Sequence, residues 1–118
     1  LLTLLSLTLG SLACSEQGSA ASPNAPVGIV TRQSTVTVEN RSDGPLENAT
    51  LTVVAFGNKE YSKTLGTLNK AEIRDSRLTD LSAADGSTFS VTFTRPKAVR
   101  LHAMNAGGQP VEVEVPWK

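Results

Sequence analysis

The chain has 118 residues, and its 11 Lys and Arg side chains are balanced by 11 Asp and Glu side chains. This length accommodates one small domain. The even balance argues against a protein that holds nucleic acid through a basic surface and against an acidic tail. A single Cys and a single His exclude, within these 118 residues, thiolate-built metal clusters, an intramolecular disulfide and the usual multi-histidine metal sites.

The first segment, residues 1–13 (LLTLLSLTLGSLA), is uncharged and rich in leucine. It is too short to span a bilayer as a helix, which takes about 20 apolar residues. Its length and character are those of the apolar region of a signal peptide. The basic residues and the Met that open such a peptide are absent, so we expect the sequence to begin a few residues inside the gene product.

The motif Ser11-Leu12-Ala13-Cys14 ends this apolar region. It resembles a bacterial lipobox, in which a small residue precedes a Cys that is lipidated and becomes the mature N-terminus. Ser11 departs from the Leu that the lipobox prefers at that place. We therefore expect Cys14 to be the lipid attachment site, and the resemblance implies more than one acyl chain, which anchors a protein stably.

Residues 14–27 contain the polar run SEQGSAASPNAP, which is too poor in apolar side chains to fold and predicts a flexible tether. Cleavage by an ordinary signal peptidase, after Ala13 or Ala20, is an alternative that would leave Cys14 without a role, and an uncleaved anchor is another. All of these place the domain outside the cytoplasm.

Ser15 bears on the membrane that would hold a lipoprotein. The lipoprotein resemblance implies that Asp at this position retains such a protein at the inner membrane, whereas Ser permits export. We expect a lipid-anchored protein of the bacterial cell envelope, on the outer membrane and facing the periplasm. A secreted or soluble periplasmic protein is the alternative.

The rest of the chain alternates apolar and polar residues with period 2, which predicts half-buried strands. These runs lie at residues 35–39, 51–56, 89–94, 99–103 and 111–115, with Trp117 continuing the last face. Turn signals lie at residues 41–45, 57–58, 85–86 and 105–108. Residues 67–84 fit neither period, and we expect irregular strands joined by loops there, with a single helical turn as an alternative.

This pattern predicts an all-β fold: an immunoglobulin-like antiparallel β-sandwich of about seven strands over residues 28–118. Only 4% of the residues are aromatic, so the core must be mostly aliphatic. Its inner faces are expected to include Val36, Val38, Leu51, Val53, Phe89, Val91, Phe93, Leu101, Val113 and Val115.

Three segments carry a resemblance to a known family: residues 38–49 (VENRSDGPLENA), 51–56 (LTVVAF) and 81–89 (LSAADGSTF). Together they resemble the small bacterial immunoglobulin-like sandwiches of the FxLYD and CARDB-like type, over roughly residues 34–117. The chain departs from that pattern at Asn58, where the family has Asp after an aromatic residue, and at Asp85, where it has Pro. The resemblance implies a fold and transfers no catalytic residue.

The residues that often carry chemistry have structural explanations here. His102 has no marked Ser or Asp partner, so we expect a surface or half-buried structural residue. Glu112 and Glu114 share one face of a strand, where Arg100 on the neighbouring strand can pair with them.

The remaining polar motifs are also explained by structure. Asp75, Asp80 and Asp85 are spaced too widely for a calcium loop. Asn40 and Asn48 match the N-glycosylation pattern, but in a bacterial chain we expect strand-end and turn residues.

The sequence therefore predicts no catalytic residue, no cofactor and no metal site. We expect a non-catalytic, lipid-anchored module that contacts another envelope protein through a sheet edge or end loops. The alternative is a small-ligand or glycan-binding lipoprotein, which an exposed patch of Tyr61 and Trp117 would indicate. A cleft that brings His102 to a Ser and an Asp would instead indicate a hydrolase.

Overall fold

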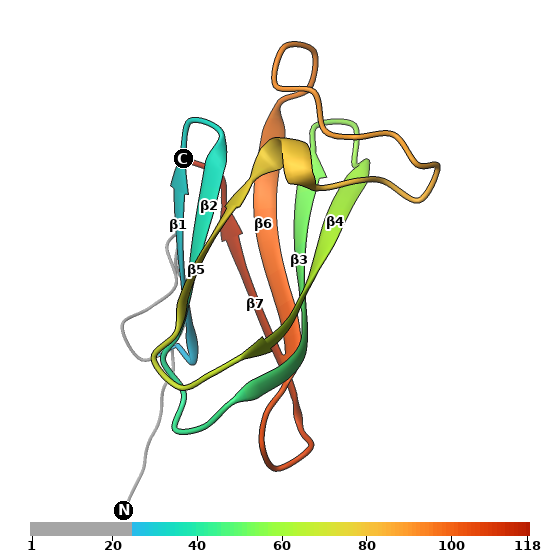
Figure 1. Ribbon diagram of the computed structural model, residues 1–118. Helices are drawn as coiled ribbons and strands as arrows, with labels where there is room; N and C mark the ends of the chain where they lie inside the picture. Colours follow the sequence, from blue (N-terminus) through green and yellow to red (C-terminus); the bar gives the residue numbers. More distant parts are fainter. Residues whose placement is uncertain (1–24) are drawn as a thin grey trace, which may run out of the picture.

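The computed structural model describes residues 25–118, which form two antiparallel sheets packed face to face (Figure 1). One sheet contains β1 (Val27–Arg32), β2 (Thr35–Asn40) and β5 (Ile73–Arg77), in the order β1-β2-β5. The other contains β3 (Leu46–Ala55), β4 (Glu60–Leu68), β6 (Pro96–Met104) and β7 (Pro110–Pro116), in the order β4-β3-β6-β7. The predicted seven-stranded sandwich is confirmed. The predictions made for residues 1–13 and Cys14 lie outside the described residues.

The fourth strand joins the third strand in one sheet. In the constant-type immunoglobulin arrangement the fourth strand belongs instead to the sheet of the first two. The β3–β4 hairpin turns at Gly57 and Asn58, whose φ angles of 92° and 68° are positive. The expected turns at residues 41–45, 57–58 and 105–108 lie between β2 and β3, between β3 and β4, and between β6 and β7, as the sequence predicts.

Most of the predicted core is buried between the sheets. The predicted residues that are buried are Val36, Val38, Leu51, Val53, Phe89, Leu101 and Val115. Val113 is partly buried and packs against them. Two predictions are wrong: Val91 is 51% exposed and Phe93 is 89% exposed.

The predicted strand at residues 89–94 does not form. Phe89 reaches the core, where its ring meets that of Tyr61 edge to face at 5.0 Å between centroids. The chain then turns, with the Thr94 amide donating to the Ser90 carbonyl at 2.9 Å. Because this segment joins neither sheet, its alternate side chains do not lie on the two faces of a sheet. Val91 and Phe93 project from a loop instead.

The strand that completes the smaller sheet is β5, which lies in the segment 67–84 where irregular strands were expected. It leads directly into a single 3-10 turn, η2 (Leu78–Asp80). The inward positions of β5 hold Arg74 and Ser76, so the strand has no apolar alternation that a sequence pattern could reveal.

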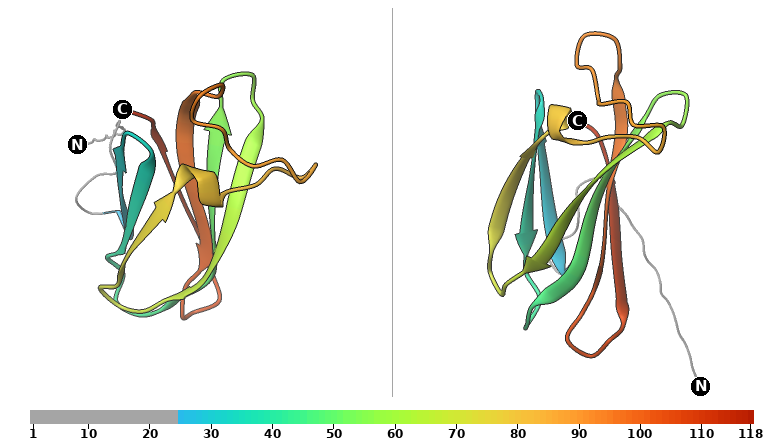
Figure 2. Two further views of the ribbon diagram at one scale, coloured as in Figure 1. Left: turned by 45° about the horizontal axis from the view of Figure 1, so that its top comes forward. Right: turned by 45° about the vertical axis from the view of Figure 1, so that its right-hand side comes forward.

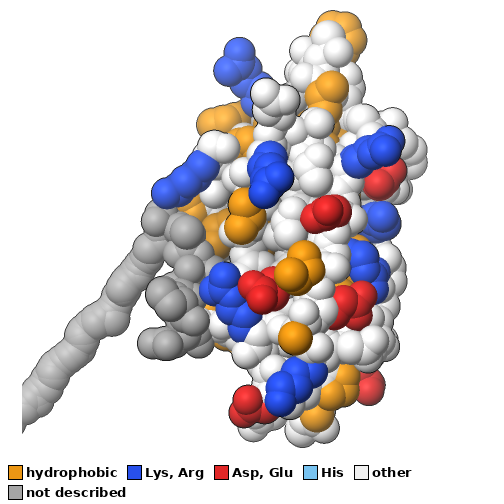
Figure 3. Space-filling model, turned by 60° about the vertical axis from the view of Figure 1, so that its left-hand side comes forward, with side chains coloured by type: hydrophobic (Ala, Val, Ile, Leu, Met, Phe, Trp, Pro, Cys, Tyr) orange, Lys and Arg blue, Asp and Glu red, His pale blue; other side chains and the backbone are white. Residues whose placement is uncertain are grey.

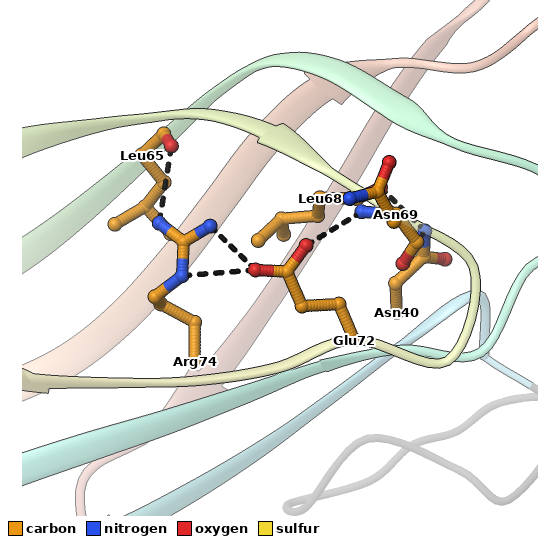
Figure 4. A network of polar contacts seen from close by, with 6 residues as sticks. All are labelled: Asn40, Leu65, Leu68, Asn69, Glu72 and Arg74. Carbon is orange, nitrogen blue, oxygen red and sulfur yellow. Dashed lines mark hydrogen bonds and ion pairs between the residues drawn. The ribbon is translucent and has the colours of Figure 1, made fainter.

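The two sheets are joined at one end by the side chain of Asn40, which is 1% exposed (Figure 4). Its Nδ2 donates to the carbonyls of Gly44 (3.0 Å), Leu68 (2.9 Å) and Asn69 (3.0 Å). Its Oδ1 accepts from the amide (2.9 Å) and the hydroxyl (2.6 Å) of Ser42. The prediction that Asn40 is a strand-end residue is confirmed, and the residue ties the end of β2 to the end of β4 in the other sheet.

A second link between the sheets lies beside Asn40 and centres on Arg74 of β5 (Figure 4). Its guanidinium donates to Glu72 at 2.6 and 3.1 Å and to the Leu65 carbonyl of β4 at 3.2 Å. The Asn69 amide donates to the other carboxylate oxygen of Glu72 at 2.8 Å. This amide, and then Arg74, hold the pKa of Glu72 below its ordinary value.

Candidate functional site: sheet edges and end loops

His102 lies exposed on the outer face of β6, as expected for a surface residue. In register, it faces Thr50 of β3 and Glu112 of β7. Neither neighbour is the Ser or Asp that a hydrolytic arrangement would place beside it.

Arg100 gathers three carboxylates on the same outer face. It lies opposite Glu114 and donates to it at 3.1 Å, and it lies 3.5 Å from Glu112 and 3.6 Å from Glu60. These contacts, led by the Glu114 hydrogen bond, raise the pKa of Arg100. The predicted cross-strand pairing is confirmed.

The three aspartates at intervals of five have separate partners. Asp75 accepts from Thr37 at 2.6 Å, and Asp80 lies 3.7 Å from Lys63. Asp85 accepts from Ser87, at 2.6 Å from the hydroxyl and 2.9 Å from the amide. Within residues 25–118, no group of three or more His, Cys, Asp and Glu side chains is placed to share a metal ion.

Tyr61 and Trp117 do not form a flat exposed patch. Tyr61 is 5% exposed. Trp117 is partly buried, packs against the core and donates its amide to the Lys97 carbonyl. The aromatic pair that would have indicated ligand binding is therefore not assembled on the surface.

The free edge of β1 is defined by its pairing with β2. The Arg41 amide donates to the Pro26 carbonyl at 2.8 Å, which makes these two residues a hydrogen-bonded pair. Because such pairs alternate along an antiparallel ladder, the peptide groups of Val27, Ile29 and Thr31 point away from β2. No described strand lies on that side of β1.

The edge of β4 is covered at Ser62. The peptide groups of Ser62 point outward and exchange two hydrogen bonds with Ser82, of 2.8 and 3.1 Å. The edge of β5 is short and carries charge at Asp75 and Arg77, and the Arg77 amide is bound by the Asp80 carboxylate at 3.4 Å. Short, charged edges resist pairing with other strands.

The edge of β7 is interrupted by prolines. The Asn105 amide donates to the Gln109 carbonyl, and the ladder continues in phase to the Trp117 amide. The outward positions of β7 are therefore Pro110, Glu112, Glu114 and Pro116. Two of these four positions have no amide hydrogen to offer a further strand.

Among residues 25–118, β1 alone presents an edge, at Ile29 and Thr31, that no proline interrupts and no other described strand covers. Val27 is 0% exposed, and the Arg41 guanidinium lies against Gly28. A groove of about 190 Å³ runs beside β1, lined by Ile29, Val30, Thr31, Val115, Pro116 and Lys118. Val30, on the outer face, is 49% exposed. Figure 3 shows hydrophobic side chains interspersed with basic and acidic ones on the side of the molecule that carries β1.

A second exposed feature lies at the end of the sandwich opposite the start of β1 (Figures 1 and 2). It consists of Phe56 in the β3–β4 turn, which is 66% exposed, with Val91 and Phe93 in the loop before β6. We name these three residues the apolar tip. The Phe56 amide donates to the Arg95 carbonyl at 3.0 Å, which joins the turn to the loop. Sequence reasoning missed the tip because Val91 and Phe93 were assigned to the core.

No family model, curated protein or solved structure matches this chain. Over residues 25–118, no helix has the length and apolar character needed to cross a membrane.

Proposed function

We propose that this chain is a non-catalytic, lipid-anchored protein of the bacterial cell envelope, and that its sandwich binds an extended segment of another envelope protein along β1. The observation that carries the proposal is the edge of β1 at Ile29 and Thr31, beside which no described strand lies, since the other three sheet edges of the described domain are partly covered, charged or interrupted by proline.

Binding at this edge takes place by strand addition. The peptide groups of Ile29 and Thr31, which pair with no described strand, supply main-chain hydrogen bonds to the added strand. The groove between β1 and β7 receives an apolar side chain of the partner, because its walls include Ile29 and Val115. Main-chain pairing supplies affinity, and the groove supplies selectivity.

The anchor rests on the sequence at the start of the chain. The apolar residues 1–13, the lipobox-like Cys14 and the polar residues that follow have the order of a lipoprotein leader and tether. Ser15 favours the outer membrane, with the domain in the periplasm. The resemblance to the FxLYD and CARDB-like sandwiches agrees with a module that has no reactive groups of its own.

The edge is tested by Val30→Lys, which places a charge on the outer face of β1 and leaves the core unchanged. We expect the yield of partner crosslinking in cells to fall by at least about tenfold. Ile73→Lys is the matched control, because Ile73 is 62% exposed on the other edge of the same sheet. Equal crosslinking by both variants would show that β1 is not the binding edge.

The anchor is tested separately by Cys14→Ala and membrane fractionation. We expect the variant to move from membranes washed at high salt, which weakens peripheral electrostatic contacts, to the soluble fraction. Retention of the variant on the washed membranes, with its partners unchanged, would contradict lipidation at Cys14.

A further inference from the structure

We propose that the apolar tip is a second membrane contact, which inserts Phe56, Val91 and Phe93 into the surface of an anionic phospholipid bilayer. In the cell this contact rests on the proposed anchoring, which keeps the domain near a membrane. The tip itself can be tested without the anchor.

The tip concentrates exposed apolar surface at one end of the molecule. The large hydrophobic residues that are exposed in the described domain are Val30, Phe56, Ile73, Val91 and Phe93. Three of these five residues come from two neighbouring turns, and Phe93 is 89% exposed. Phe56 and Phe93 line one groove, and exposed apolar side chains that lie together mark contacts with a protein or a membrane.

The charges around the tip favour an anionic surface. Lys59, Arg95 and Lys97 are exposed beside it, and Lys59 and Arg95 line a groove of about 390 Å³ together with Phe56 and Phe93. Lys59 is paired with Asp85 at 3.1 Å. In the described residues, Arg95 and Lys97 have no carboxylate within ion-pair distance, and the Nζ of Lys97 donates to Asn58 at 3.3 Å. Basic side chains near a bilayer are attracted by its anionic headgroups.

The apolar side chains are held in place by the backbone of the two turns. The Asn58 amide donates to the Ala55 carbonyl at 2.9 Å, and the Thr94 amide donates to the Ser90 carbonyl at the same distance. The bond from Phe56 to Arg95 then links one turn to the other. The tip therefore needs little ordering on insertion, and it offers protruding side chains in place of a strand edge, which favours a lipid surface over an extended peptide.

The tether limits how the tip can meet the membrane that holds the anchor. The 13 residues from Cys14 to Pro26 span at most about 45 Å, and the protein is 59 Å along its longest axis. The tip can therefore meet the same bilayer when the domain lies tilted against it, and not when the domain stands upright on its tip.

The test uses the processed chain that begins at Cys14 and carries Cys14→Ser, so that no acyl chain is present. Sedimentation with vesicles of phosphatidylglycerol and phosphatidylcholine is compared with sedimentation with vesicles of phosphatidylcholine alone. We expect binding to the anionic vesicles that weakens as salt is raised. Phe56→Ser with Phe93→Ser should lower the partition coefficient by at least about tenfold.

Arg95→Gln with Lys97→Gln should weaken binding to the anionic vesicles by about fivefold per residue. Ile73→Ser is the apolar control, since it removes an exposed hydrophobic side chain away from the tip, and its binding should be unchanged. An unchanged thermal transition shows that each variant is folded.

Two results would overturn the proposal: no sedimentation with anionic vesicles, or equal sedimentation of the wild-type and Phe variants. Loss of a crosslinked protein partner in the Phe variants, without loss of vesicle binding, would assign the tip to a protein contact instead. Because the tested chain carries no lipid, either failure leaves the separate test of the anchor at Cys14 unaffected.

Discussion

Replacement of Asn40 by Ala removes the side chain that joins the ends of β2 and β4. Of its three carbonyl acceptors, Leu68 is the one that is buried, and the contacts to Gly44 and Asn69 are only part-buried. A buried carbonyl left without a partner costs about 1–3 kcal/mol, and bonds that water can replace cost about 0.5 kcal/mol each. We expect Asn40→Ala to lower the free energy of unfolding by about 3 kcal/mol.

This loss is large for a domain of this size, for which a change of 1 kcal/mol shifts Tm by about 4–8 °C. We expect Tm to fall by about 15 °C, measured by circular dichroism, with urea unfolding to show that the m-value is unchanged. Asn69→Ala is the control, because Asn69 accepts the hydrogen bond from Asn40 through its backbone carbonyl, which the substitution keeps. Its free energy of unfolding should change by no more than about 0.5 kcal/mol. A loss of less than about 1 kcal/mol for Asn40→Ala would refute the role assigned to this side chain.

Asn40→Asp separates the hydrogen bonds from the packing, because the two side chains have nearly the same shape. A carboxylate at this site would face the three carbonyls that Asn40 now bonds, so the folded state should raise its pKa above the unfolded value. Its neutral form is then the better tolerated one. The variant should be least destabilised below the unfolded pKa of about 3.9 and lose stability as pH rises through the folded pKa.

Three further predictions concern single residues. The Oγ of Ser76 is buried without a hydrogen-bond partner in the described domain, so Ser76→Ala should stabilise the fold by about 1 kcal/mol, and a lower urea midpoint would contradict this. Ala71 has a φ of 66°, so Ala71→Gly should raise stability by about 1 kcal/mol as left-handed strain is relieved, and a drop in Tm would show that this strain is absent. The lowered pKa of Glu72 implies stability that is present above its ordinary pKa of 4.5 and lost as pH falls through the folded pKa. Glu72→Gln should flatten the acid limb of the stability curve, and an unchanged limb would assign it to other groups.

Period-2 alternation predicted β2, β3, β6 and β7, because alternate side chains of those strands point to the core, but it predicted no strand at β1 or β4. It could not identify β5, whose inward residues are Arg74 and Ser76. It also misplaced Phe93, because residues 89–94 alternate in the sequence but form a loop that joins neither sheet.

The candidate site was predicted only as a class of surface. The sequence contains no recognisable reactive motif, and on that ground we expected the contact surface to be a sheet edge or an end loop. The choice of β1 needed the strand order, since whether a strand lies at an edge depends on its neighbours. The protective role of Pro110 and Pro116 depends on the phase of the β7 ladder, which a single sequence does not reveal.

The prolines of β7 and the Ser62–Ser82 bonds on β4 limit how copies of this domain can associate. A fibre that grows by edge-to-edge pairing of sheets requires each copy to offer two unprotected sheet edges, so that every added copy exposes a new edge. When each copy has a single unprotected edge, pairing two copies covers both edges and growth stops. At high local concentration, such a domain can therefore keep one sheet edge open without polymerising.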